Sequence, residues 1–203
     1  MKNEHALPGY LAVALALLFP VYWISVFGAG GDQDLFETVR ADIMRLSGWD
    51  ALFVLIGAIE IYLYLSLRTV LAQRLHTSLP TVLLLMMAIV VGVFHATVLF
   101  DLAFAVGPAF DESTSDQLVF ASMVVGIAGL FVYAVLALVL SITLLRGSAE
   151  SPTLLKVFAI LLLACCVLQF TIVLGFVNLL LFPLALLALA AFFLRGEHAV
   201  EVV

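Results

Sequence analysis

Long apolar runs take up most of this chain and leave few residues from which a water-soluble surface could be built. Of its 203 residues, 66% are hydrophobic and only 11% are charged, whereas soluble domains carry about 25% charged residues. Backbone polar groups inside a bilayer must bond within their own segment or close into a barrel, and runs of about 20 apolar residues satisfy this as helices. The sequence therefore predicts an integral, multi-pass membrane protein.

The apolar runs divide into six spans, which predict an all-α bundle of six transmembrane helices forming a single domain over residues 1–203. The final run, from Leu154 to Leu194, would be about 60 Å long as one helix, twice the hydrocarbon thickness. Gly175 and Asn178 offer a break within it. The first run exceeds the core of a cleaved signal peptide and is interpreted as a retained span. The predicted spans are about 7–27, 49–71, 79–106, 118–145, 152–174 and 178–194.

The polar stretch between the first two spans predicts a short amphipathic helix on the membrane surface. Its apolar residues recur at helical spacing while charged residues occupy the other faces. The apolar positions are Leu35, Phe36, Val39, Ile43 and Leu46.

Basic residues are distributed unevenly between the two sides that six spans would create. One side would hold both termini and six Lys and Arg residues, and the other side only Arg40 and Arg45. Because cytoplasmic loops are enriched in Lys and Arg, we expect both termini in the cytoplasm. We expect the membrane to be the plasma membrane of a bacterium or archaeon. The six basic residues are Lys2, Arg68, Arg74, Arg146, Lys156 and Arg195.

Glu60 lies near the middle of the second span, where a carboxylate is costly. Insertion scales place an Asp at a helix centre at about +2.5 to +3.5 kcal/mol, and ionisable residues at such positions are functional candidates. Glu60 lies 11 residues after Trp49, and His95 lies 11 residues before Val106. Both side chains are therefore expected roughly 16 Å below the outer surface. They can meet if the two helix faces agree, either as a proton-handling pair or as a structural hydrogen bond that fixes helix register.

The remaining polar candidates also fall in the outer half of the predicted bundle. Tyr64 lies one helical turn after Glu60, on the same face. The inner half is nearly all aliphatic, so the sequence predicts an outward-facing polar pocket that is closed on the cytoplasmic side. The other candidates are Asp101, Gln169 and Asn178.

Several classes of site find no support in the sequence. Only one histidine lies within a span, and no zinc or haem spacing is present, so we predict no metal site and no cofactor. No nucleotide-binding glycine motif or serine nucleophile motif occurs. The net charge of −6 argues against nucleic acid as a partner. The lipid bilayer is the one expected partner, with a homo-oligomer or a partner membrane subunit left open.

Three functions remain open on the sequence alone. The first is a protein that binds or transports a small lipophilic or cationic ligand in the outward-facing pocket, with Glu60 and His95 as polar contacts. The second is an intramembrane enzyme acting on a lipid or isoprenoid, with one of these residues as general base. The third is a structural subunit or assembly factor. Its contact surface would be a stripe of mostly small residues, Ser122, Gly126, Gly129, Tyr133, Ala137 and Ser141.

Overall fold

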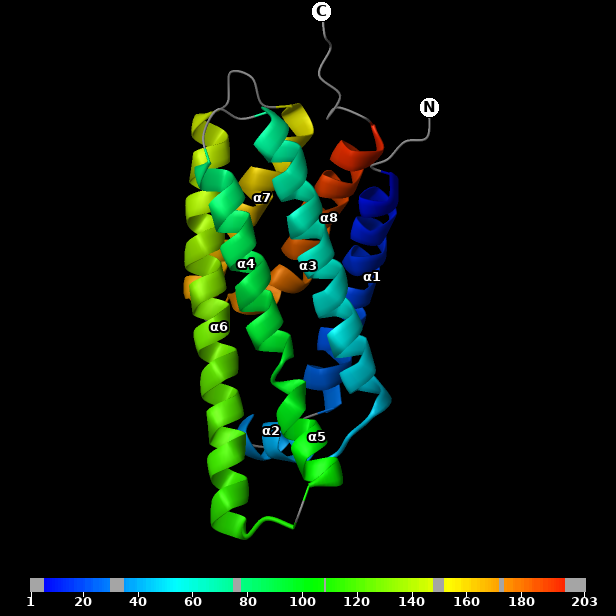
Figure 1. Cartoon of the computed structure of the whole chain (residues 1–203), viewed down its shortest axis with the longest axis vertical. Coiled ribbons are helices and arrows are strands. Elements are labelled where there is room, and N and C mark those ends of the chain that lie inside the picture. Colours follow the sequence, from blue (N-terminus) through cyan, green and yellow to red (C-terminus); the bar gives the residue numbers. More distant parts are fainter. Residues whose placement is uncertain are drawn as a thin grey trace, which may run out of the picture.

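A computed structural model describes residues 6–29, 35–74, 78–107, 109–147, 152–171 and 174–195. These residues form eight α-helices and one 3-10 turn (Figure 1). Six helical segments among them are long and apolar enough to cross a membrane, in agreement with the predicted all-α bundle of six spans. The elements are α1 (Ala6–Ala29), α2 (Leu35–Ile43), α3 (Gly48–Arg74), α4 (Leu79–His95), α5 (Val98–Val106), α6 (Glu112–Arg146), α7 (Thr153–Phe170), η1 (Gly175–Val177) and α8 (Asn178–Leu194).

The six spans form a closed ring. Contacts run from α1 to α3, from α3 to α4, from α4 to α6, from α6 to α7, from α7 to α8, and from α8 back to α1. The short connection between α3 and α4 makes them antiparallel neighbours, as the sequence predicted. A ring of six helices encloses more space than a four-helix bundle, so side chains must fill its centre or leave a cavity.

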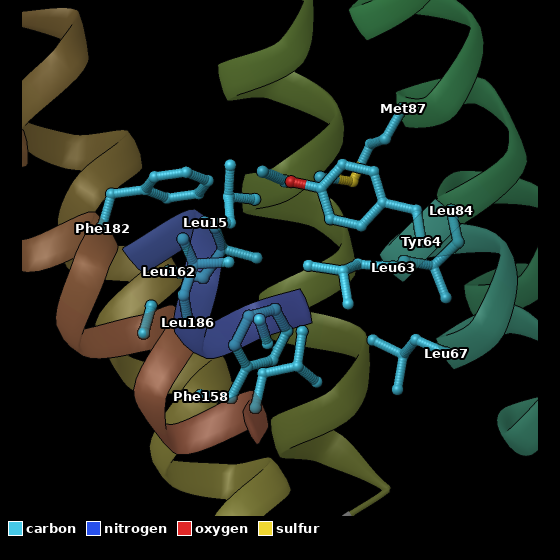
Figure 2. Packing of buried hydrophobic residues seen from close by; sticks show 14 of the residues in the cluster. Leu15, Leu63, Tyr64, Leu67, Leu84, Met87, Phe158, Leu162, Phe182 and Leu186 are labelled. Atoms are coloured by element: carbon cyan, nitrogen blue, oxygen red, sulfur yellow. The ribbon is translucent and has the colours of Figure 1, made fainter. Parts of the chain in front are cut away.

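One end of the ring is filled by large apolar side chains. This end also carries Arg68, Arg146, Lys156 and Arg195 and is called the basic end. Figure 2 shows side chains from α3, α4, α7, α8 and α1 converging on the centre of the bundle. Toward the basic end the core is continuous and almost fully buried. Its members include Leu67, Leu71, Leu140, Leu155, Phe158, Phe192 and Phe193.

The third span is broken about two thirds of the way along, which the sequence did not indicate. α4 ends at His95 and α5 begins at Val98. At the break, the backbone N–H groups of Thr97 and Leu99 bond the carbonyls three residues back, those of Phe94 and Ala96. The Thr97 hydroxyl also donates to the Phe94 carbonyl at 2.7 Å. Side-chain hydroxyls that bond backbone carbonyls in this way compete with the regular helical ladder, so Thr97 stabilises the break.

The opposite end of the molecule carries α2, α5 and the start of α6, and is called the acidic end. α2 is the predicted amphipathic helix, and it packs against α5 and α6 (Figure 1). Ile43 on α2 is buried, and Arg40 pairs with Asp116 of α6 at 2.9 Å. α6 begins six residues before the predicted boundary because the Asp111 carboxylate accepts from the Thr114 N–H at 2.9 Å. Hydrogen bonding from the Thr114 hydroxyl, together with that from the Thr114 N–H, lowers the pKa of Asp111.

The hairpin formed by α7 and α8 is shorter than predicted. We predicted that the fifth span continues to residue 174, but α7 ends at Phe170. The Thr171 N–H and hydroxyl both donate to the Leu168 carbonyl, and the hydroxyl also accepts from the Leu174 N–H, so this residue satisfies backbone groups at the turn. Gly175–Val177 then form η1, which leads directly into α8. The segment 171–177 is called the hairpin tip; its residues 172 and 173 lie outside the described part of the chain.

Candidate functional site

A cavity of about 490 Å³ lies inside the helix ring. All six spans contribute to its wall: α1 near Tyr22, α3 near Glu60, the end of α4, the middle of α6, the end of α7, and the start of α8. Its volume falls in the range of pockets that hold small ligands. Because the basic end of the ring is packed solid, the cavity occupies the part of the bundle nearer the acidic end.

Glu60 is the one carboxylate among the described residues that line the cavity. The residue is only 7% exposed, and its Oε1 accepts from the Tyr64 hydroxyl at 2.7 Å. The Tyr64 hydroxyl also bonds the Tyr133 hydroxyl on α6. A hydroxyl has one proton to donate, so the Tyr133 hydroxyl donates to Tyr64 and the Tyr64 hydroxyl donates to Glu60. This chain of two hydrogen bonds ties α3 to α6 and orients the carboxylate.

His95 lies at the end of α4 and lines the same cavity. Its Nδ1 donates to the Val91 carbonyl at 2.9 Å. Because a carbonyl only accepts, Nδ1 carries the proton, and Nε2 is an acceptor in the neutral ring. The ring packs on the Phe53 ring with centroids 4.3 Å apart, and it covers the backbone of Gly57. A Cβ atom added at Gly57 would lie 2.6 Å from His95 Cδ2, so only glycine admits the imidazole here.

The structure brings Glu60 and His95 to one cavity but does not join them. No hydrogen bond between the two side chains occurs in the described part of the chain. Tyr64 bonds Glu60 and Tyr133, and Arg68, one turn further along α3, is exposed. Glu60 and His95 are therefore separate polar positions on the cavity wall.

Gln169 and Asn178 meet at the other side of the cavity. Asn178 Nδ2 donates to the Cys165 carbonyl at 3.1 Å and to Gln169 Oε1 at 3.3 Å. Asn178 Oδ1 is buried and has no hydrogen-bond partner among the described residues. The two amide side chains thus hold the hairpin together, and one buried acceptor remains available on the cavity wall.

Asp101 does not line the cavity. It lies on α5 at the acidic end, where it experiences the charges of Asp42 and Asp50. Partial burial and the Asp50 carboxylate raise the pKa of Asp42. Asp50 itself is buried and accepts from the Ser47 N–H at the start of α3. Among the described residues, no three His, Cys, Asp or Glu side chains are placed to hold a metal ion.

Two features of the cavity were not predicted from the sequence. Tyr133 had been assigned to a packing stripe on α6, although a tyrosine hydroxyl within an apolar run needs a partner and could have signalled the network. The aromatic wall was also missed, because its members come from four different helices. It consists of Phe19, Tyr22 and Trp23 on α1, Phe53 on α3, Phe94 on α4, and Phe182 on α8.

The predicted stripe on α6 is used inside the chain. Ala137 and Ser141 are fully buried, and Gly126 and Gly129 lie against Phe94 of α4. Small residues here let α4 and α6 approach closely. The described part of α6 therefore uses this stripe for packing within the chain.

The chain matches no protein-family model, and no similar protein was found among the curated proteins or among the solved structures. The function is therefore argued from the cavity itself.

Proposed function

We propose that this integral membrane protein binds a lipophilic organic cation in the cavity. The observation that carries the proposal is a buried carboxylate, Glu60, on a wall that is otherwise mostly aromatic and aliphatic. No Lys or Arg occurs among the described residues that line the cavity, so the carboxylate has no basic side-chain partner there. A buried carboxylate is costly without a partner, and a cationic ligand would supply one.

The aromatic wall supports the same class of ligand. The rings of Tyr22 and Phe53 stack with centroids 5.4 Å apart, and Phe94 meets Phe53 edge to face. The rings of Phe19 and Phe182 lie with centroids 4.8 Å apart, and Trp23 connects this pair to the other rings of the wall. The faces of such rings attract cations, by about 2 kcal/mol or more where water is excluded. Quaternary ammonium groups are held in this way, without hydrogen bonds.

The helix backbone and the Asn178 side chain add acceptors to the cavity wall. α4 ends beside the cavity at Phe94 and His95, and the C-terminal end of a helix carries partial negative charge. Broken membrane helices supply cation ligands through such ends. Asn178 Oδ1 adds a buried acceptor with no partner among the described residues. All of these groups favour a positive charge over a negative one.

We also propose that the basic end faces the cytoplasm, as the distribution of Lys and Arg suggests. The cavity then lies toward the outer side of the membrane and is closed toward the cytoplasm by the packed core. Transport across the membrane would require the helices around that packed core to move apart. We therefore propose ligand binding rather than transport.

Thermal unfolding of the purified chain with a matched pair of ligands tests the proposal. Phenyltrimethylammonium and tert-butylbenzene have nearly the same shape and differ in charge. We expect the cation to raise the melting temperature of the parent protein and the neutral compound to have much less effect. In Glu60→Gln the cation should bind at least about tenfold more weakly, a loss of about 1.4 kcal/mol or more. Glutamine can still accept from Tyr64, so this variant should fold.

Glu112→Gln provides the matched control. Glu112 is exposed at the start of α6 and lies outside the cavity, so the same chemical change should leave cation binding unchanged. Equal shifts from the cation and its neutral counterpart, or equal cation affinity in Glu60→Gln and the parent, would exclude a cation site at this carboxylate.

A further inference from the structure

Apart from Thr171, the exposed described side chains at or beside the hairpin tip between α7 and α8 are apolar, whereas the polar side chains of the flanking helices face the cavity. Phe170, Leu174, Phe176 and Leu180 are all exposed large apolar residues at or beside the tip. Gln169 and Asn178, from the two flanking helices, line the cavity instead. A connection bathed in water usually carries polar or charged residues, so this pattern points to an apolar surrounding.

The depth of the tip follows from helix lengths. Phe170 is 14 residues from Lys156, or about 21 Å, and Asn178 is 17 residues from Arg195, or about 26 Å. Both distances are shorter than the roughly 30 Å of a bilayer's hydrocarbon core. If the basic residues lie at one hydrocarbon boundary, the tip ends inside the hydrocarbon of the far leaflet.

The contact between α6 and α7 supports this depth independently. The rings of Phe131 and Phe170 have centroids 6.2 Å apart, which sets the tip level with Phe131. From there α6 continues for 19 residues, or about 28 Å, to Glu112. Figure 1 shows α6 extending far past the hairpin. The tip therefore stops well short of the acidic end of the molecule.

The cavity reaches the outside at this tip. Among the described residues that line the cavity, only Phe176 is exposed, with 66% of its surface accessible. All the others are buried or partly buried. Phe176 thus contacts both the cavity and the surroundings of the protein. Gly175, beside it, also lines the cavity.

We propose that the cavity opens to the hydrocarbon of the outer leaflet at Phe176 and that the ligand is a single-chain cationic amphiphile. Its head group occupies the aromatic cavity near Glu60, and its alkyl chain extends past Phe176 into the lipid. The identity of the head group rests on the proposed function above, whereas the lipid-facing opening rests on the depth of the tip and the exposure of Phe176.

Phe176→Trp reports directly on the opening, since an exposed phenylalanine tolerates this exchange. The protein is placed in phosphatidylcholine vesicles, and the emission of the parent, which contains Trp23 and Trp49, is subtracted. We expect lipids brominated on their acyl chains to quench most of the added emission and aqueous iodide to quench little. Glu112→Trp, at the exposed start of α6, should show the reverse. Quenching of the residue-176 tryptophan by iodide rather than by brominated lipid would overturn the proposal.

A brominated ligand tests the position of the alkyl chain. Dodecyltrimethylammonium carrying bromine along its chain should quench the residue-176 tryptophan with a saturable component beyond the quenching caused by simple partitioning. Adding Glu60→Gln should remove that component while leaving lipid quenching intact. Saturable binding without quenching at residue 176 would overturn the proposed path of the chain.

The two proposals fail in different ways. If the cavity does not bind cations, the thermal shift with phenyltrimethylammonium and the saturable component are both absent, but brominated lipids still quench. If the opening is wrong, the thermal shift remains in the parent protein while lipid quenching at residue 176 is lost.

Discussion

Replacing Gly57 by alanine should distort the candidate site from the side of α3. The added Cβ would lie 2.6 Å from His95 Cδ2 and 2.7 Å from Nδ1, about 0.8 Å short of ordinary contact. The imidazole cannot retreat freely, because it stacks on Phe53 and donates to the Val91 carbonyl. Overpacking of this kind costs about 1–3 kcal/mol. The better helix propensity of alanine offsets this by about 0.5–1 kcal/mol.

The expected net loss is therefore up to about 2.5 kcal/mol, or a melting temperature lower by up to about 10 °C for a chain of this size. Unfolding can be followed with a thiol-reactive dye, because Cys165 and Cys166 are buried and are the chain's two cysteines. Gly92→Ala is the matched control on the facing helix. Its Cβ would meet Ile61 Cδ1 at 3.7 Å, an ordinary contact, so stability should stay equal or rise slightly.

A double variant isolates the cause. Adding His95→Ala to Gly57→Ala removes the ring that the new methyl group meets, so the loss caused by Gly57→Ala should largely disappear in that background. If Gly57→Ala and Gly92→Ala melt at the same temperature, or if removal of the imidazole gives no relief, the packing of His95 on Gly57 does not govern stability.

Three further outcomes follow from the same geometry. Tyr133→Phe removes the hydrogen bond to Tyr64 and should lower the free energy of unfolding by about 0.5–1.5 kcal/mol, whereas Tyr62→Phe, at an exposed tyrosine, should not. Asp42→Asn should stabilise the protein at pH 7 by less than about 1 kcal/mol, because burial and Asp50 oppose ionisation of Asp42 in the folded state. This gain should vanish below pH 3.8, the ordinary pKa, where the carboxyl is neutral in both states, and melting curves across pH would detect that loss. A reporter that is active only in the cytoplasm, fused to the C-terminus, should be active if the basic end faces inward.

The six spans could be predicted from the sequence because a helix that crosses the bilayer needs a continuous apolar stretch of about 20 residues, and such stretches can be read directly from the sequence. The lipid environment requires these stretches to be helical. Because charged residues are rare inside the predicted spans, Glu60 could be identified as a candidate without any knowledge of packing. Glu60, His95, Gln169 and Asn178 were selected as rare polar groups, and all four line the cavity.

The arrangement of the site could not be predicted in the same way. Whether Glu60 bonds His95 or Tyr64 depends on helix rotation, which apolar runs leave undetermined because nearly every face is apolar. Tyr133 enters the site only because α6 closes the ring beside α4 and α7. Asp101 lies outside the cavity because the break after His95 begins a separate helix, α5, that packs against α2.

The short hairpin makes the hydrophobic thickness of the molecule unequal around its circumference. α7 and α8 are about 27 and 26 Å long, whereas α6 is about 52 Å long. Beside the hairpin, the proposed depth of the tip leaves outer-leaflet hydrocarbon above it, whereas the apolar part of α6, residues 118–145, is about 42 Å long and requires lipids to thicken or that helix to tilt. The protein therefore places uneven demands on bilayer thickness and should gather longer-chain lipids beside α6. Its stability should depend on acyl-chain length, with an optimum below the thickness that α6 alone would require.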